Sequence, residues 1–452
     1  MIGAVLNRRS RIAVGSLVVI SALLQYRSFH QSQTSGKSST LSEDFPGREL
    51  KAPFGKVIRT PKFFDDLESQ EKQAFDNGDC LTPPTVHHSI PGVSDSVAAT
   101  LMAAADFHVG SQAEQPEVRQ IGPGANYVVW DGVSGAGNAP EWMMHNGRAS
   151  AWNNNEYLEA KEINLVAPIR WELEKPGIVM EGDYVGFHNW INGNYPHLLM
   201  DHLSMMAWLD QEVVSEDTKF IFVDMPITKH VMSKLDPEFF ENRLVWIKPG
   251  ELFHVTGMLT VATPKKWPQE GFMSNLLQWL RRIHPEPVVK DKYIFYSRTS
   301  KEVYHGRKMN VEFEKSVIDI VRHKMHQQLG ISGDELIIFN GLNEDGSQIP
   351  FDEQYDLFSR AKTIIGPHGG GMANMVWSSV PRVESCSERV QVLEFMGSAS
   401  FYGTFYGLPI DHHIIPFTAR TSDQNQELFI DLRDLKDALD TMWHRDPESI
   451  KE

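Results

Sequence analysis

The chain has 452 residues, of which 41% are hydrophobic, 23% are charged and only two, Cys80 and Cys386, are cysteine. This length predicts two or three domains with ample apolar core, and the formal net charge of -16 argues against nucleic acid as the main partner. The two cysteines leave open one disulfide in an oxidising compartment or two buried thiols.

The first 62 residues predict a membrane anchor and a stem. Three arginines lie within residues 1–11, and the run 12–24 carries no charge. Positive residues before a short apolar run are typical of a signal peptide or a type II signal anchor, and the absence of a small-residue cleavage site favours the anchor. We therefore expect a cytosolic tail at 1–11, an anchor at 12–26 and a flexible stem at 27–62.

The N-terminal domain is expected at 63–287. Its clearest predicted element is a helix from His197 to about residue 209, with Pro196 in its first turn. His197 and Asp201 lie four residues apart on this helix, so they share a face. The carboxylate could hold one tautomer of the imidazole and leave the other nitrogen to accept a proton. Three interpretations stay open: an acid/base pair, a metal site with His188 and His202, or a structural pair near the surface.

Strand-like and helix-like segments alternate along the rest of the chain. Strands are expected at 219–223, 243–247, 258–262, 292–297, 335–339, 362–366 and 390–395, with an edge strand at 414–417, and helices at 228–235, 270–283, 311–328, 351–361 and 432–443. This alternation predicts an α/β fold with parallel sheets covered by helices. Pro285 and Pro287 predict a boundary, which places the C-terminal domain at 288–452.

The most informative stretch is a glycine turn between an expected strand and a helix-compatible run at 372–377. His368 opens this turn and is followed by Gly369, Gly370 and Gly371. Glycines leave backbone N–H groups open to a ligand, and with a helix dipole they bind phosphate. The pattern is neither the dinucleotide fingerprint nor a Walker loop. It therefore favours a nucleotide-diphosphate site, with a purely structural turn as the alternative.

Three charged residues are expected at the same edge of the sheet. Arg298 ends the strand at 292–297, and Arg307 lies in the loop after it, so both guanidinium groups could bind phosphate. Glu394, near the end of the strand at 390–395, could accept hydrogen bonds from ribose hydroxyls. Each alone could be a solvated charge, but together with the glycine turn they favour a nucleotide site.

Four segments resemble, in matching order, those of glycosyltransferase family 61. They are NYPHLLMD, YSR with GRKMNVE, IIGPHGGGMANMVW and VQVLEF, which span roughly residues 184–395. The family includes plant β-1,2-xylosyltransferases, EGF-domain O-GlcNAc transferases and O-mannose β-1,4-GlcNAc transferases. The resemblance implies a GT-B fold of two Rossmann-like domains facing a cleft, an inverting mechanism, a UDP-sugar donor and type II residence in the endoplasmic reticulum or Golgi.

The resemblance also implies a set of site residues. They are His197 and Asp201 as catalytic residues, Asn194 on the acceptor side, and Arg298, Arg307, Glu312, His368, Gly369, Asn374 and Glu394 as ligands of the donor nucleotide. Gly370, in the same glycine turn, is expected to bind the donor with them. Two departures leave the donor sugar open. Asn310 is displaced by one position from the family's usual spacing, and Gly370 stands where alanine is common.

No Asp-x-Asp motif occurs in the chain, so no metal cofactor is expected. The charge that develops on UDP would then be met by arginines, backbone N–H groups and a helix dipole. We predict an inverting transferase that moves xylose, GlcNAc or arabinose from a UDP-sugar to a hydroxyl of a glycan or glycoprotein, with the membrane as a further partner. The alternatives are a membrane-anchored glycan-binding pseudoenzyme with a GT-B shell and a nucleotide-dependent α/β enzyme such as an epimerase.

Overall fold

A computed structural model describes the greater part of the chain beyond residue 116. The described residues are 56–58, 85–86, 117–129, 141–145, 148–153, 156–159, 177–187, 195–248, 251–263, 270–299, 308–381, 388–397, 408–419 and 427–443. They belong to one compact unit, Phe54–Glu452. The expected tail and anchor, both cysteines, His188, Asn194 and Arg307 lie outside them. Within these ranges, no helix has the length and apolar character needed to cross a membrane.

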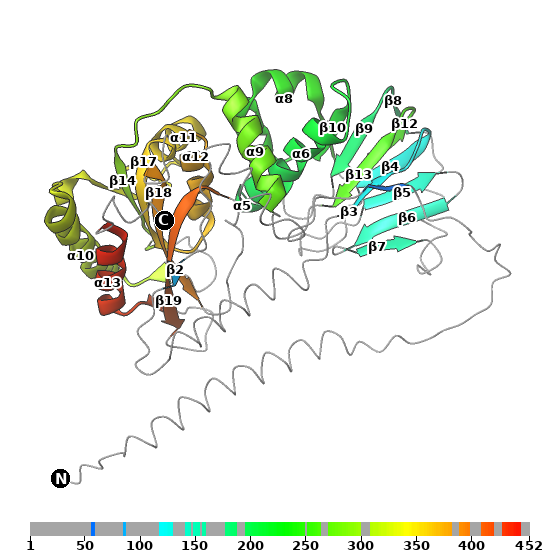
Figure 1. Ribbon diagram of the computed structural model, residues 1–452. Helices are drawn as coiled ribbons and strands as arrows, with labels where there is room; N and C mark the ends of the chain where they lie inside the picture. The colour runs from blue at the N-terminus through cyan, green and yellow to red at the C-terminus, as the bar shows by residue number, and fades with distance from the viewer. Residues whose placement is uncertain are drawn as a thin grey trace, which may run out of the picture. The chain divides into compact units, whose positions relative to one another are not determined.

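A mixed sheet forms the centre of the N-terminal half (Figure 1). Its described strands run in the order β1-β3-β13-β9-β10-β11. They are β1 (Lys56–Ile58), β3 (Glu117–Gln120), β13 (Leu259–Thr263), β9 (Tyr184–Phe187), β10 (Lys219–Val223) and β11 (Leu244–Ile247). The four strands from β13 to β11 are parallel, whereas β1 and β3 are antiparallel. β1 falls within the range expected for the stem, so the ordered sheet begins earlier than the sequence suggests.

A largely antiparallel sheet, which the sequence did not predict, packs against the first one; only β8 pairs in parallel among its described strands, with β12. Its described strands are β7 (Glu156–Glu159), β6 (Arg148–Asn153), β5 (Glu141–His145), β4 (Ala125–Val129), β12 (Leu252–Val255) and β8 (Ile178–Met180). Buried residues of both sheets form one cluster, in which Phe253 and Val255 of β12 meet Ile221 of β10 and Val261 of β13. Sheet-on-sheet packing of this kind covers one face of the mixed sheet.

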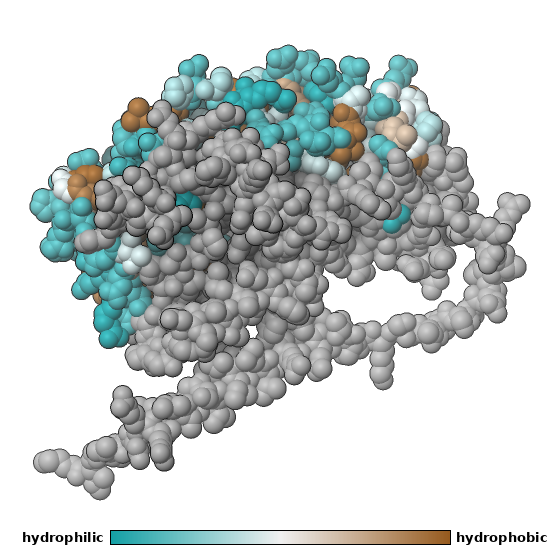
Figure 2. Space-filling view, viewed as in Figure 1, coloured by the Kyte–Doolittle hydropathy of each residue, from teal (hydrophilic) through white to brown (hydrophobic). Residues whose placement is uncertain are grey.

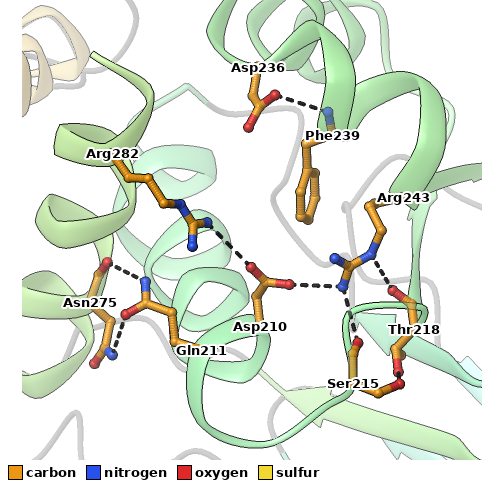
Figure 3. A network of polar contacts seen from close by, with 9 residues as sticks. All are labelled: Asp210, Gln211, Ser215, Thr218, Asp236, Phe239, Arg243, Asn275 and Arg282. Carbon is orange, nitrogen blue, oxygen red and sulfur yellow. Dashed lines mark hydrogen bonds and ion pairs between the residues drawn. The ribbon is translucent and has the colours of Figure 1, made fainter. Parts of the chain in front are cut away.

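Helices cover the other face of the mixed sheet. They are α5 (Tyr195–His197), the π-helix η2 (Leu198–Leu203), α6 (Ser204–Glu212), α7 (Pro226–Leu235), α8 (Pro237–Arg243) and α9 (Glu270–Ile283). Polar contacts lock α6 to its neighbours (Figure 3). Arg243 of α8 donates to Asp210 of α6 at 2.8 Å and to the Thr218 carbonyl at 2.6 Å, and Gln211 of α6 bonds Asn275 of α9. These contacts fix α6, which continues the helical segment that carries His197.

The C-terminal half is built on a largely parallel sheet. Along its main path the described strands run in the order β15-β20-β19-β18-β17-β14-β16, and β2 pairs with β19. They are β15 (Lys308–Met309), β20 (Glu427–Phe429), β19 (Ile410–Ala419), β18 (Val390–Gly397), β17 (Ala361–Pro367), β14 (Lys292–Tyr296), β16 (Leu336–Phe339) and β2 (Thr85–Val86). The expectation of an edge strand at 414–417 is wrong, because β19 pairs with β18, β2 and β20.

Helices lie on both faces of this sheet, as the alternating pattern predicts (Figure 1). α10 (Val311–Leu329) and α13 (Leu432–Trp443) pack on one face against Ile365 and Leu393. α11 (Phe351–Ser359) and α12 (Met375–Ser379) pack on the other, and two short 3-10 turns, η3 (Gly333–Glu335) and η4 (Gly370–Asn374), complete the described elements.

One apolar core passes from the N-terminal helices to α11 and α12. The same buried cluster contains Leu203, Trp279, Phe358 and Trp377. Polar contacts reinforce this junction. Arg281 of α9 donates to the carbonyls of Ser379 and Val380, and Lys290 donates to those of Ser359 and Ser378. The two halves are therefore packed together, and the domain boundary after residue 287 stays a prediction.

The described surface has no large apolar face on the side drawn in Figure 2. Over α8, α9 and α10 it is mainly hydrophilic, with hydrophobic residues scattered among polar ones. Scattered apolar residues of this kind are normal for a globular surface.

Candidate active site

The first part of the site is the helix that begins at Tyr195. Pro196 lies in its first turn, where the missing N–H of proline is tolerated. The chain then widens into the π-helix Leu198–Leu203, all of whose residues are buried, before regular α-helix resumes at Ser204. π-Helical turns are rare and often occur at functional sites. The sequence predicted the helix but not this widened turn.

His197 and Asp201 make the contact that their spacing predicted. His197 Nδ1 lies 2.7 Å from Asp201 Oδ2, with the imidazole side chain 25% exposed and the carboxylate 2% exposed. An ionised carboxylate accepts hydrogen bonds and cannot donate them. Asp201 therefore keeps the proton of a neutral imidazole on Nδ1, and the lone pair of that ring is on Nε2. His197 is thus a partly exposed imidazole that is held by a buried carboxylate.

His202 does not join that pair. Its Nδ1 lies 3.2 Å from the His197 carbonyl oxygen, and its buried ring packs 6.3 Å from Phe187. Among the described residues, no group of three or more His, Cys, Asp or Glu side chains is arranged to hold a metal ion. His202 therefore contacts the backbone of His197.

The second part of the site lies at the carboxyl ends of two neighbouring parallel strands. Arg298 follows β14 and His368 follows β17, and these strands pair in parallel. Arg298 is buried, and its Nη1 donates to the His368 carbonyl at 2.5 Å. The structure thus brings together two residues that the sequence placed at one edge of the sheet, the edge where open α/β sheets bind ligands.

Glu314 holds Arg298 in place and was missing from the sequence-based candidates. Its Oε2 accepts from the Ser297 hydroxyl at 2.7 Å, and its Oε1 accepts from the Arg298 backbone N–H at 3.0 Å. Burial raises the pKa of Glu314, and these two hydrogen bonds oppose that rise. A signal was available, because Glu314 lies three residues before Val317 on the apolar face of α10.

The glycine turn leaves two backbone donors for a ligand. The N–H of His368 donates to Phe395, that of Gly371 to the Tyr296 hydroxyl, and that of Met372 to Gly369. No described residue accepts from the N–H groups of Gly369 and Gly370. Backbone donors almost always find partners, so adjacent unclaimed N–H groups beside a guanidinium suit an anion.

The α-helix after the turn begins three residues later than the sequence suggests. The chain forms the 3-10 turn η4 and then only the five residues of α12. Short helices carry a small dipole. The attraction for an anion at this turn therefore comes mainly from the guanidinium and the N–H groups.

Glu394 lies deeper than a direct ligand of the donor would. Its side chain is 0% exposed, with Oε1 2.7 Å from His368 Nδ1 and Oε2 3.0 Å from His412 Nε2. Burial alone would raise the pKa of this carboxyl, but the adjacent His368 and His412 lower it overall. Both oxygens are occupied by imidazoles, so Glu394 orients His368.

Of the two remaining predicted residues, one is buried at the glycine turn and the other is exposed. Asn374 is buried, and its Oδ1 accepts from the Tyr195 hydroxyl at 2.6 Å. Glu312 is exposed on the first turn of α10, where its N–H donates to Asn310. Asn374 is thus tied to the His197 helix, whereas no described contact joins Glu312 to Arg298 or to the turn.

The two parts of the site lie next to each other. A methyl group at Gly370 would lie 3.6 Å from the ring of Pro196, the residue before His197. The Tyr195–Asn374 hydrogen bond crosses the same junction. The start of the helix that carries His197 therefore lies against the glycine turn.

Comparisons with known proteins assign the central part of the chain to a family. Residues 195–386 match the family model described as Glycosyltransferase 61, a range that includes the His197 helix, Arg298 and the glycine turn. No curated protein matches the chain.

Two solved structures show a weak overall similarity. One is the bacterial iron-containing dodecameric glycosyltransferase TibC from enterotoxigenic E. coli H10407, at 10% identity, with 70% of this chain and 86% of that chain covered and a TM-score of 0.28. The other is the dodecameric iron-containing heptosyltransferase TibC in complex with ADP-D-beta-D-heptose, at 11% identity, with coverages of 70% and 83% and a TM-score of 0.28.

Proposed function

We propose that this chain, whose residues 195–386 match the glycosyltransferase 61 family model, is an inverting enzyme with a GT-B fold that moves a sugar from a UDP-sugar to a hydroxyl of a glycan or glycoprotein. The single observation that carries the donor assignment is the pair of N–H groups at Gly369 and Gly370, which have no acceptor among the described residues and lie beside the Arg298 guanidinium. Amide hydrogens and a guanidinium are the groups that bind a diphosphate without a metal ion.

In this proposal the diphosphate of the donor lies against the turn. Arg298 and the Gly369 and Gly370 N–H groups meet its charge, and His368, held by Glu394, lies beside them. Arg307, Glu312 and Asn374 belong to the donor side by the family resemblance.

The acceptor enters from the side of the His197 helix, where Asn194 is expected. His197 Nε2 takes the proton of the acceptor hydroxyl while Asp201 stabilises the imidazolium that forms. The acceptor oxygen bonds to the anomeric carbon as the bond from that carbon to the phosphate oxygen breaks, and UDP leaves with the electron pair. One displacement from the face opposite UDP inverts the configuration. Exposure favours His197 over Asp201 as the base, because the carboxylate is buried.

We also propose that the enzyme resides in the Golgi or endoplasmic reticulum membrane with its catalytic part in the lumen. The support is the three arginines within residues 1–11, followed by the charge-free run at 12–24. Type II membrane glycosyltransferases have this arrangement.

The test begins with the donor. The purified full chain is heated with UDP-xylose, UDP-GlcNAc, UDP-arabinose or ADP-glucose, each at high concentration. A ligand held at 100 times its dissociation constant stabilises a protein by about 2.7 kcal/mol, so a true donor raises the melting temperature measurably. The stabilising donor is then incubated with glycan acceptors, and the anomeric configuration of the product is read by NMR. A stabilising donor and an inverted product support the proposal. A lack of stabilisation by every UDP-sugar, or a retained configuration, refutes it.

A further inference from the structure

A buried hydrogen-bond network joins the two parts of the site. The Tyr195 hydroxyl donates to Asn374 Oδ1 at 2.6 Å and accepts from Trp377 Nε1 at 2.9 Å. Tyr195 begins the helix that carries His197, whereas Asn374 and Trp377 follow the glycine turn. The network therefore connects segments that are about 180 residues apart in the chain.

The partners of Tyr195 are rigidly held. Asn374 and Trp377 are 1% and 0% exposed. Asn374 Nδ2 also donates to Gln354 at 3.2 Å, and the Trp377 ring packs edge-on against Phe351 at 5.4 Å. Burial raises the pKa of Tyr195, so its hydroxyl stays protonated and remains a donor. Satisfied buried polar networks of this kind fix a unique geometry.

The hydrogen-bond network lies close to His197 and the glycine turn, but it includes neither the His197 ring nor the N–H groups of the turn. Tyr195 lies two residues before His197, and Pro196 between them contacts the site of Gly370. Asn374 lies four residues after Gly370. A change in this hydrogen bond would therefore move the imidazole relative to the N–H groups of the turn. Misplacement by about 1 Å can reduce turnover by about 100-fold.

We propose that Tyr195 is a positioning residue whose hydroxyl sets the distance between the helix carrying the base and the donor-binding turn. The proposal rests on the function proposed above. In the proposed function the diphosphate is bound by the turn and by guanidinium groups, and the proton is taken by His197 with Asp201, so the Tyr195 hydroxyl contacts neither the donor nor the transferred proton. Loss of the Tyr195 hydroxyl should therefore lower kcat and leave donor affinity unchanged.

Tyr195→Phe is a clean perturbation because it leaves no buried polar group without a partner. Trp377 Nε1 lies 3.1 Å from Asn374 Oδ1, so the hydrogen bond between these two groups remains when the Tyr195 hydroxyl is removed. The penalty for an orphaned buried donor or acceptor is thus avoided. The variant should fold and lose only the link between the two segments.

Tyr355→Phe provides the matched control. The Tyr355 ring lies 5.4 Å from that of Trp377 in the same aromatic cluster, and no hydrogen bond of its hydroxyl to a described residue is present. We expect kcat to fall at least tenfold in Tyr195→Phe and by less than twofold in Tyr355→Phe. UDP affinity should stay within twofold of wild type in both, and their melting temperatures should agree within about two degrees.

Three results would overturn the proposal: full kcat in Tyr195→Phe, an equal loss in Tyr355→Phe, or a loss of UDP affinity that accounts for the loss of rate. Hydrogen exchange gives a readout that does not depend on activity. In Tyr195→Phe the amides of 195–203 and of 369–379 should both exchange faster, and in Tyr355→Phe those of 195–203 should not. If wild type transfers no sugar but this exchange pattern appears, the proposed function fails and the link stands. An unchanged pattern in Tyr195→Phe refutes the link.

Discussion

Replacing Gly369 by alanine tests whether the Arg298 guanidinium binds the donor. The added methyl group would lie 1.8 Å from Nη1 and 2.7 Å from Cζ of Arg298. The backbone itself does not resist the change, because φ of 164° at Gly369 is an extended conformation. All of the strain therefore falls on the guanidinium, which must move by about 1.6 Å to bring the 1.8 Å separation to the 3.4 Å of ordinary contact.

The size of the effect follows from the contacts that this movement breaks. The hydrogen bond from Nη1 to the His368 carbonyl is 2.5 Å long and does not survive such a shift. A hydrogen bond with a charged partner contributes about 1.5–3 kcal/mol, and the same loss applies to the contact with a diphosphate. UDP should therefore bind about 10- to 150-fold more weakly. The free energy of unfolding should fall by about 1–2 kcal/mol, because the alanine partly offsets the lost bond by restricting the unfolded chain.

Isothermal titration calorimetry with UDP measures this change, and Gly370→Ala is its control. The same methyl group one residue later meets only Pro196, at an ordinary 3.6 Å. We expect a smaller loss of UDP affinity in that variant than in Gly369→Ala, since no charged contact is broken. If Gly369→Ala binds UDP as tightly as Gly370→Ala does, the guanidinium is not a ligand of the diphosphate and the assignment of Arg298 fails.

Three further predictions concern the base and two buried charges. His197→Ala should lower kcat by about 10²- to 10⁴-fold with UDP affinity unchanged, and Asp201→Asn should lower it less, as initial rates and calorimetry can measure; unaltered rates would exclude the pair. The folded-state pKa of Glu394 is lowered to about 2, so its contribution to stability is present above about 4.5 and lost as pH falls toward 2. Glu394→Gln should therefore lower stability at pH 6, and its urea midpoint should depend less on pH between 6 and 3; an identical pH dependence would contradict this. Burial and the nearby Arg281 lower the pKa of Lys290 to about 7. Between pH 7 and 10 the unfolded chain therefore binds more protons than the folded protein does, so the free energy of unfolding of the wild type should rise with pH. Lys290→Met should lack that rise.

The C-terminal half could largely be predicted from the sequence because its contacts follow local periodicity. The predicted helices at 311–328 and 432–443 correspond to Val311–Leu329 and Leu432–Trp443. Two strands followed by Arg298 and His368 were enough to place these residues together, since neighbouring parallel strands end at one edge. Parallel strands alternating with helices leave few arrangements open.

The antiparallel sheet could not be predicted in the same way. β12 pairs with β4 and β8, which are more than 70 residues away in the chain. Its strands are short, and no long periodic segment precedes them. Pairing between such distant short strands depends on the packing of the whole core.

The deeper residues of the site depend on tertiary contacts as well. Glu394 resembles an ordinary strand-end acid, and its role is visible only once His412 of β19 lies beside it. The π-helical turn before Ser204 likewise depends on the core that buries all six of its residues. A period of 3.6 residues predicts a helix there, and it does not predict the extra residue in the turn.

The apolar core that runs from α6 and α9 to α11 and α12 has a consequence for engineering. Trp279 and Trp377 belong to one buried cluster on opposite sides of the predicted boundary at residue 287. A chimaera joined there would replace half of an interdigitated interior, and mismatched side chains would leave cavities or overlaps. Donor preference in this enzyme is therefore better altered by exchanging loops around the glycine turn than by exchanging whole halves between relatives.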